Sequence, residues 1–279
     1  MKHKAIAAIA AALTASLLLT ACNSPKEEVS AGRLDAIKKA GKITMATSPD
    51  YAPYEFIDVT KTGQESFAGA DIELGKYIAL KLGAELVIEA MDFTAAQGAV
   101  TSGKVDMSIS GYAYTDERAE SMELSIFYNL DRTDKQQGVL IRKEDADKYK
   151  TAEDFAGKKV AVQNASLQYN LLAKHVPEAE VELVADLKDA VMMLITKKVD
   201  AVGVSTKNGE AFSKNYSDVQ MSSFYYDRAD EGTVVAVTKG ETELIEKINE
   251  ILAEVNDKDL YSDWLEDAQT LAAAMALSE

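Results

Sequence analysis

Apolar residues along this chain recur in two alternating patterns. Short apolar runs predict strands over 43–47, 86–88, 105–109, 138–141, 160–162 and 233–237. Apolar residues one helical turn apart, several of them followed by glycine, predict helices over 32–40, 69–82, 94–101, 167–174, 186–198, 241–255 and 259–274. The alternation predicts an α/β fold with binding groups at the carboxyl ends of its strands.

The length allows two lobes, because 279 residues of which 47% are hydrophobic can bury a sizeable core. A polar and charged stretch within 126–137 interrupts the pattern and predicts a crossing from one lobe to the other. The triplet Lys-Val-Asp stands before an apolar run at 104–106 and again at 198–200. We interpret this echo as the same strand–helix arrangement in both lobes rather than as a sequence repeat.

The amino-terminal segment predicts export and lipid attachment. Residues 1–21 have a basic start followed by an uncharged apolar stretch that is short for a membrane span. Leu-Thr-Ala then precedes Cys22, which resembles the lipobox of bacterial lipoproteins. That resemblance implies a signal peptide, lipidation of Cys22 (palmitate among the lipids), a flexible tether over 22–32 and an extracytoplasmic, lipid-anchored location. An ordinary secretory signal with an incidental cysteine is the alternative.

The composition excludes several classes of partner. The formal net charge is -16, and an acidic chain is repelled by nucleic acid and by anionic membrane surfaces. A single cysteine forms no internal disulfide, and no His/Cys cluster supports a metal site. We therefore expect no cofactor, no metal and no nucleic-acid partner.

The stretch 110–121 carries the strongest chemical signal. A predicted strand ends at Ser110, a polar turn follows, and Arg118 stands just after it. A guanidinium beside the backbone groups at a strand end is a good receptor for a carboxylate, because its fork of N–H donors matches two oxygens.

This stretch also resembles a known family. Residues 111–118 and 122–125 are similar to the segment G-x-T-x-T-x-E-R-x-x-x-x-D-F-S of family 3 of the bacterial extracellular solute-binding proteins, the polar amino-acid receptors of ABC importers. The resemblance implies that Arg118 holds the ligand's α-carboxylate, with Gly111 and Ala113 as backbone partners. Ala113 stands where the family usually has threonine, so one hydroxyl donor is missing.

Two aromatic residues are predicted to sandwich the ligand side chain. The loop after the first strand resembles the family's T-x-x-x-F-x-P-F-E-F, which implies that Tyr51 packs on the ligand and that Tyr54 and Phe56 lie in the core. Phe93 stands at the aromatic position that the family places opposite the first aromatic.

The second lobe is predicted to contribute polar groups. Ser166 precedes a helix, where it can cap that helix, bind the carboxylate, or do both. Gln163 and Ser205 would face the ligand from this lobe. Ser205 replaces the aspartate with which the family pairs the ligand's ammonium, and a buried ammonium needs a charged partner.

Two explanations of this replacement stay open. Asp227, Asp230 or Glu231 could supply the missing charge from the second crossing, or the ligand could lack a free α-amino group. Because no counter-charge for arginine or lysine stands at a motif position, and because Gln163 supplies no cation, the motifs favour a neutral polar, aromatic or modified amino acid.

The resemblance implies a two-lobed fold of the type II periplasmic-binding-protein class. Lobe 1 would comprise 33–128 and 233–279, lobe 2 would comprise 137–226, and the hinge crossings would be 129–136 and 227–232. The implied function is ligand capture by hinge closure, as a monomer that delivers its ligand to the membrane permease subunits of an importer. The alternatives are a dehydratase-like enzyme on the same fold, or a ligand sensor without a transporter; because no pocket carboxylate stands at a motif position, we expect no enzyme activity.

Overall fold

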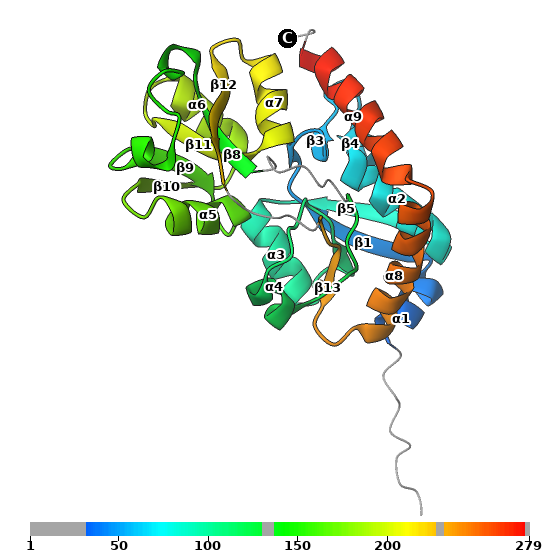
Figure 1. Cartoon of the computed structure of the whole chain (residues 1–279). Coiled ribbons are helices and arrows are strands. Elements are labelled where there is room, and N and C mark those ends of the chain that lie inside the picture. Colours follow the sequence, from blue (N-terminus) through cyan, green and yellow to red (C-terminus); the bar gives the residue numbers. More distant parts are fainter. Residues whose placement is uncertain (1–31, 130–136, 227–231, 277–279) are drawn as a thin grey trace, which may run out of the picture. The chain divides into compact units, whose positions relative to one another are not determined.

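The computed structural model describes residues 32–129, 137–226 and 232–276 (Figure 1). Two five-stranded sheets organise these residues, each with helices on both faces, and a small three-stranded sheet lies beside the first. The α/β, two-lobed fold predicted from the sequence is therefore confirmed.

The first sheet has the strand order β5-β1-β6-β13-β7. Its strands are β1 (Lys42–Thr47), β5 (Glu85–Ala90), β6 (Met107–Ser108), β7 (Met122–Leu124) and β13 (Ala236–Thr238). β1 pairs in parallel with β5 and β6, whereas β13 runs antiparallel to β6 and β7. β13 comes from the end of the chain, so this lobe is built from both ends.

The two faces of the first sheet carry separate apolar cores because successive strand residues point to opposite sides. Ile43 and Met45 of β1 pack with α2 (Ala70–Leu82) and with the late helix α8 (Thr242–Asp257), and α1 (Arg33–Ala40) adds to this cluster. Ala46, the residue after Met45, packs on the opposite face with α3 (Phe93–Thr101).

The second sheet repeats this arrangement with the order β10-β9-β11-β8-β12. Its strands are β8 (Gln137–Arg142), β9 (Lys159–Gln163), β10 (Glu180–Val184), β11 (Ala201–Ser205) and β12 (Val219–Tyr225). Val160 and Val162 of β9 face α5 (Leu167–His175), while Ala161 faces α6 (Leu187–Ile195). α7 (Thr206–Asn215) follows β11 directly and contributes Phe212 to the α6 side.

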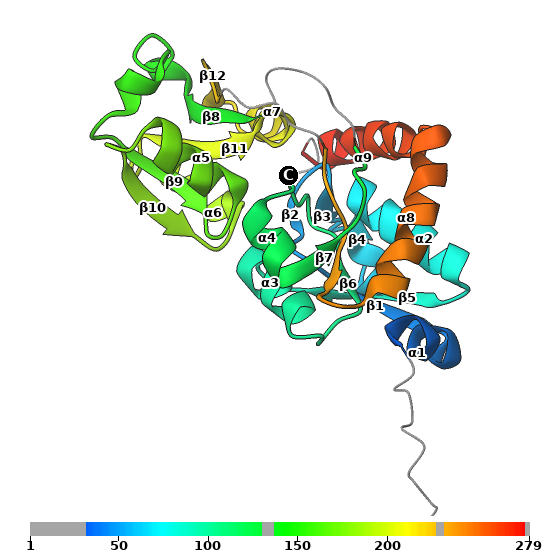
Figure 2. The ribbon, with the colours of Figure 1, turned by 60° about the horizontal axis from the view of Figure 1, so that its bottom comes forward.

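The last helix, α9 (Leu260–Ala276), lies beside α2 in both views (Figures 1 and 2). Its first half joins the lobe 1 core through Tyr261 and Leu265. Its second half covers the small sheet through Ala268 and Ala272. That sheet consists of β2 (Asp50–Tyr51), β3 (Glu55–Ile57) and β4 (Phe67–Ala68), and short 3-10 helices lie at Gly63–Ser66, Lys143–Asp145 and Ala152–Phe155.

The element predictions succeed where the periodic pattern is long. α2 ends where the glycine stop predicted, since Gly83 takes a left-handed conformation (φ 70°) and its N–H caps the helix. The predicted strand 105–109 is much shorter as β6, and the predicted strand 233–237 pairs regularly only from Ala236 onwards as β13. Two α-helices and six strands were not predicted from the sequence: α4 (Asp116–Ser121), α7, β2, β3, β4, β7, β10 and β12. Among the described helices, none is both long and apolar enough to cross a membrane.

Candidate functional site

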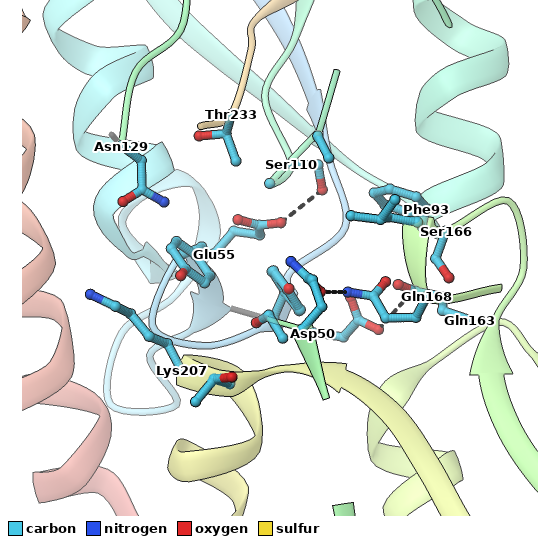
Figure 3. A pocket seen from close by; sticks show the side chains of 18 of the residues that line it. Asp50, Glu55, Phe93, Ser110, Asn129, Gln163, Ser166, Gln168, Lys207 and Thr233 are labelled. Atoms are coloured by element: carbon cyan, nitrogen blue, oxygen red, sulfur yellow. Dashed lines mark hydrogen bonds between the residues drawn. The ribbon is translucent and has the colours of Figure 1, made fainter. Parts of the chain in front are cut away.

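A cavity of about 360 Å³ lies between the sheets and is lined by residues of both lobes (Figure 3). Every predicted ligand residue within the described ranges lines it: Tyr51, Phe93, Gly111, Ala113, Arg118, Gln163, Ser166 and Ser205. The remaining lining residues were not predicted as ligand contacts: Asp50, Tyr54, Glu55, Ser110, Asn129, Gln137, Leu167, Gln168, Thr206, Lys207, Glu210, Gly232 and Thr233. Asp227, Asp230 and Glu231, proposed from the sequence as ammonium partners, lie outside the described residues, as does Cys22.

Arg118 is held firmly at the edge of this cavity. It belongs to α4, whose N-cap Thr115 accepts the backbone N–H of Arg118 (3.2 Å). The guanidinium is buried; Nη1 donates to the carbonyl of Ala113 (2.7 Å) and Nη2 to the carbonyl of Ala165 in lobe 2 (3.0 Å). Nε donates to the amide oxygen of Gln97 (3.3 Å). These partners are neutral, so they orient the guanidinium without cancelling its charge.

Aromatic rings surround the guanidinium and the cavity. The Arg118 carbon Cζ lies 5.6 Å from the ring centre of Phe93 and 5.3 Å from that of Tyr112, within cation–π range. Tyr51 stacks on Tyr54 with ring centres 5.2 Å apart. Tyr54 is buried in the core, as the sequence predicted, and also lines the cavity.

Gly111 is required by its surroundings. Its φ of 59° is left-handed, and a Cβ there would lie 3.0 Å from the ring of Tyr51. Its N–H donates to the carboxyl of Asp71 (2.7 Å). Because this N–H already has an acceptor within lobe 1, only the other backbone atoms of Gly111 remain for contact with a ligand.

Two carboxyl groups are buried together below Gly111. Glu55 is fully buried, and its Oε1 accepts the Ser110 hydroxyl (2.8 Å), while its Oε2 has no hydrogen-bond partner among the described residues. Asp71 accepts the hydroxyls of Tyr261 (2.6 Å) and Tyr128 (3.0 Å) as well as the Gly111 N–H. Asp71 lies in the first turn of α2, so this helix contributes to the polar network.

Burial, and then the charge of Asp71, raises the pKa of Glu55 well above 4.5. Burial also raises the pKa of Asp71, but the donated hydroxyls and N–H oppose that rise. Two buried carboxyls with no cation between them do not both ionise readily. Because three donors favour the charge on Asp71, the proton resides on Glu55.

Asp50 is the third acidic group of the cavity. Its Oδ1 accepts the Ser48 hydroxyl (2.8 Å). Its Oδ2 accepts the amide of Gln163 and the backbone N–H of Leu187, each at 2.9 Å, and both of these belong to lobe 2. Burial raises the pKa of Asp50 to about 6.

The lobe 2 wall is largely neutral. Ser166 caps α5 by accepting the Tyr169 N–H (3.2 Å), and Ser205 caps α7 by accepting the Asn208 N–H (3.3 Å). The amide of Gln168 donates to that of Gln137 (2.7 Å). Lys207 and Glu210 of α7 are the charged groups of this wall.

Two cavity carboxyls with raised pKa values revise the expectation that no such group would line the pocket. Pocket carboxyls with raised pKa values were not expected, yet Asp50 and Glu55 both line the cavity. Asp50 lies in β2 and Glu55 in β3, within the loop after β1 in which the family motif pointed to the aromatic residues. In the pairing of β2 with β3, Asp50 stands opposite Phe56 and Tyr51 opposite Glu55, and strands this short give no periodic signal in the sequence. No group of three or more His, Cys, Asp or Glu side chains suited to a metal ion occurs in the part of the chain that the structure describes.

Comparison with known proteins gives three findings. The family described as bacterial extracellular solute-binding proteins, family 3, matches residues 43–267. The arginine-binding extracellular protein ArtP of Bacillus subtilis is 30% identical over 92% of this chain and 94% of its own length. A crystal structure of the amino-acid ABC transporter substrate-binding protein AbpA of Streptococcus pneumoniae bound to L-arginine is similar with a TM-score of 0.78 and 28% identity, covering 86% of this chain and 99% of AbpA.

One partial match is to an enzyme. The cyclohexadienyl dehydratase of Pseudomonas aeruginosa is 28% identical over 120 residues, which is 43% of this chain and 42% of that protein. This match is much shorter than the match to the arginine-binding protein.

Proposed function

This chain belongs to family 3 of the bacterial extracellular solute-binding proteins, and we propose that it captures an amino acid for an ABC importer. Its relatives by sequence and structure support this role, because their names describe an arginine-binding protein and an amino-acid transporter component. The observation that carries the proposal is Arg118, a buried, oriented cation at the edge of a cavity lined by both lobes.

The ligand's α-carboxylate would bind Arg118, with Ala113 and the helix start at Ser166 as further partners. A carboxylate suits this place because charge-assisted hydrogen bonds to a guanidinium are strong and directional. The N-termini of helices such as α5 also favour negative charge. Gly111 would contribute its carbonyl to the ligand, since its N–H donates to Asp71.

We propose a cationic side chain for the ligand, in place of the neutral one that the motifs favoured. Glu55 lines the cavity, has an unpartnered oxygen among the described residues, and has no cation paired with it there. A guanidinium or ammonium would supply the missing counter-charge, and Tyr51 and Phe93 would flank the chain that carries it. The arginine-binding relatives support the same ligand class. Asp227, Asp230 or Glu231 remain our candidates for the α-ammonium.

Hinge closure is the proposed mechanism of capture. We keep the boundaries 33–128 with 233–279 for lobe 1 and 137–226 for lobe 2 as a proposal, which the membership of the strands in the two five-stranded sheets supports. The hinge crossings 129–136 and 227–232 fall mostly outside the described residues. A ligand that contacts both walls stabilises the closed form by its differential contacts.

We further propose that Cys22 is lipidated and anchors the chain, as a monomer, on the outer side of the cell membrane, where it would meet the permease subunits. The small residues before Cys22 support this. The mass of the processed amino-terminal peptide tests it: a lipid-modified Cys22 at the new terminus is expected, and an unmodified cysteine would contradict the anchor.

Ligand capture without chemistry is favoured over catalysis. The relative matched over nearly its whole length is a binding protein, whereas the dehydratase matches in part. The raised carboxyls Asp50 and Glu55 are nevertheless groups that acid–base catalysis could use, so dehydration of a cyclohexadienyl compound is the second candidate function. Loss of water from such a compound, followed by absorbance, would establish it.

A thermal-shift panel tests the proposed function. L-Arginine, L-lysine, L-histidine, L-glutamine and α-N-acetyl-L-arginine would each be added to the purified protein and to its Arg118→Ala variant. A ligand at 100 times its Kd stabilises the folded state by about 2.7 kcal/mol, which is easily seen as a shift in Tm. We expect the largest shift with a cationic amino acid and none in the variant. A shift only with the acetylated acid would mean that no ammonium is recognised, and no shift with any member would refute the amino-acid assignment.

A further inference from the structure

Asp50 lies where the two lobes meet, and its carboxyl is held from both sides (Figure 3). The residue belongs to β2 of lobe 1, and α6 of lobe 2 packs against that strand. One oxygen takes two donors from lobe 2 and the other takes one from lobe 1. Asp50 is also mostly buried, with 8% of its surface exposed.

The lobe 2 partner of Asp50 is the start of α6. The first N–H groups of a helix have no acceptor within it. Asp186, the N-cap, accepts the N–H groups of Lys188 (2.6 Å) and Asp189 (3.4 Å). The N–H of Leu187 is accepted by Asp50 instead. A carboxyl of lobe 1 thus completes the cap of a lobe 2 helix, where the helix dipole favours negative charge.

Gln163 reinforces the same contact. Its amide nitrogen carries two hydrogens, and it donates to Asp50 Oδ2 (2.9 Å) and to the carbonyl of Ala185 (3.0 Å). Ala185 directly precedes α6, so the amide ties β9, the α6 start and β2 together. The sequence predicts that Gln163 faces the ligand; in the structure it lines the cavity, and both hydrogens of its amide nitrogen are used in the contact between the lobes.

We propose that Asp50 is the positioning residue that holds the two lobes together, by docking its carboxyl on Gln163 and on the first N–H of α6. This goes beyond ligand capture as proposed above and does not depend on which ligand binds. The other described hydrogen bonds between the lobes run from Asn208 to the Ala52 carbonyl (3.0 Å), from Asn164 to Thr94 (3.1 Å), and from Gln97 (3.4 Å) and Arg118 (3.0 Å) to the Ala165 carbonyl. They join neutral groups or a guanidinium, which keeps its charge in proteins. Asp50 is therefore the member of this contact that responds to pH.

The direction of that response follows from the groups around the carboxyl. Burial is the largest cause of its raised pKa, the charge of Asp186 on α6 adds to it, and the donors Leu187 and Ser48 oppose it. Glu55 on β3 is the other acid that interacts with Asp50. When the lobes separate, water returns to the carboxyl and its pKa falls toward the ordinary value of 3.8.

The closed form therefore binds the proton more tightly than the open form, and closure becomes more favourable as the pH falls through about 6 toward 3.8. The protonated acid keeps the contact intact. Its Oδ1–H donates to the Ser48 hydroxyl oxygen, while Oδ2 still accepts from Leu187 and Gln163.

A distance measurement between the lobes in the absence of added ligand tests the proposal. Spin labels at Leu80→Cys on lobe 1 and Leu183→Cys on lobe 2, both exposed positions, report closure in a Cys22→Ser background. The closed fraction of the otherwise unchanged protein is expected to be several-fold higher at about pH 5 than at about pH 7.5.

Two substitutions separate the charge from the contact. Asp50→Asn keeps the oxygen acceptor without the charge, so it is expected to stay closed at both pH values. Asp50→Ala removes the acceptor and is expected to stay open at both. Asp189→Asn, which removes an exposed acid from the same turn of α6, is the matched control and should keep the pH response of the parent. Equal closed fractions in the parent, Asp50→Asn and Asp50→Ala proteins, or a pH response that survives in Asp50→Asn, would overturn the proposal.

Discussion

The two walls of the cavity differ in chemistry. Lobe 1 supplies the buried ionisable groups Arg118, Glu55 and Asp50, each fixed by hydrogen bonds within the fold. Lobe 2 supplies mainly hydroxyls and amides at strand ends and helix starts, such as Ser166 and Ser205, and its charged residues Lys207 and Glu210 lie on one helix. We therefore expect lobe 1 to recognise the charges of the ligand and lobe 2 to complete the contacts on closure. The predictions below test this division.

The largest effect is expected from the two buried arginines, one in each lobe. Arg118→Ala should weaken binding of L-arginine on the order of 100-fold or more, because it removes a charge-assisted receptor for the carboxylate. Arg142 is also buried, but its Nε pairs with Asp145 (2.7 Å) and its Nη1 with the carbonyls of Leu194 and Val199, within lobe 2. Arg142→Ala should lower the free energy of unfolding by about 3 kcal/mol.

Isothermal titration calorimetry and thermal unfolding of both variants measure these outcomes. An unchanged affinity for L-arginine in Arg118→Ala would contradict the hypothesis that lobe 1 recognises the charges of the ligand. A loss of affinity in Arg142→Ala, with stability unchanged, would do the same.

A smaller effect is expected from the two glutamates that line opposite walls. Glu55→Gln should weaken L-arginine binding by about 1.5–3 kcal/mol and leave L-glutamine binding nearly unchanged, since it removes a buried counter-charge. Glu210→Gln, the matched control at an exposed position in the middle of α7, should change either affinity little. Equal losses for both ligands in Glu55→Gln would show that Glu55 acts on the fold rather than on charge recognition.

The same residue gives a pH prediction. Because the pKa of Glu55 is raised, its carboxyl stays protonated at pH values above the ordinary pKa of 4.5 when no ligand is bound. A cationic ligand favours the ionised carboxylate. Binding of L-arginine should therefore release a proton, and its affinity should rise as the pH rises through the raised pKa. Calorimetry in two buffers of different ionisation enthalpy detects the proton; Glu55→Gln should abolish its release.

The stability of the folded protein without ligand should fall as the pH rises, opposite to the rise in affinity for L-arginine. A carboxyl whose pKa is raised in the folded state stabilises the fold when protonated and loses that contribution as the pH rises. The parent protein without ligand should therefore lose stability relative to Glu55→Gln as the pH rises above 4.5. A constant difference in Tm across that range would contradict the buried, protonated state of Glu55.

The smallest effect is expected from two buried tyrosines, again one in each lobe. Tyr261 donates its hydroxyl to Asp71 (2.6 Å), so Tyr261→Phe should cost about 1–3 kcal/mol of stability. The Tyr226 hydroxyl is buried without a partner among the described residues, so Tyr226→Phe should be neutral or slightly stabilising. Chemical denaturation of both variants measures the difference in the free energy of unfolding. Equal losses would mean that the hydrogen bond from Tyr261 to Asp71 does not stabilise the fold.

The sequence by itself determined the elements and the residues whose signal is local. The long periodic helices, the glycine stop at Gly83 and the family motif around Arg118 depend on neighbours in the chain, and neighbours are visible in a sequence. The aromatic pair Tyr51 and Phe93 was found for the same reason, because each stands at a motif position.

Only the tertiary structure decided how the carboxyls act. Asp50 contacts Gln163 and Leu187, which lie more than a hundred positions away in the sequence, and Glu55 contacts Ser110, which lies 55 positions away. Their charge states depend on burial and on these distant donors, and neither quantity is a property of the local sequence. Neither acid was therefore singled out from the sequence, whereas folding places both at the cavity and Asp50 also at the contact between the lobes.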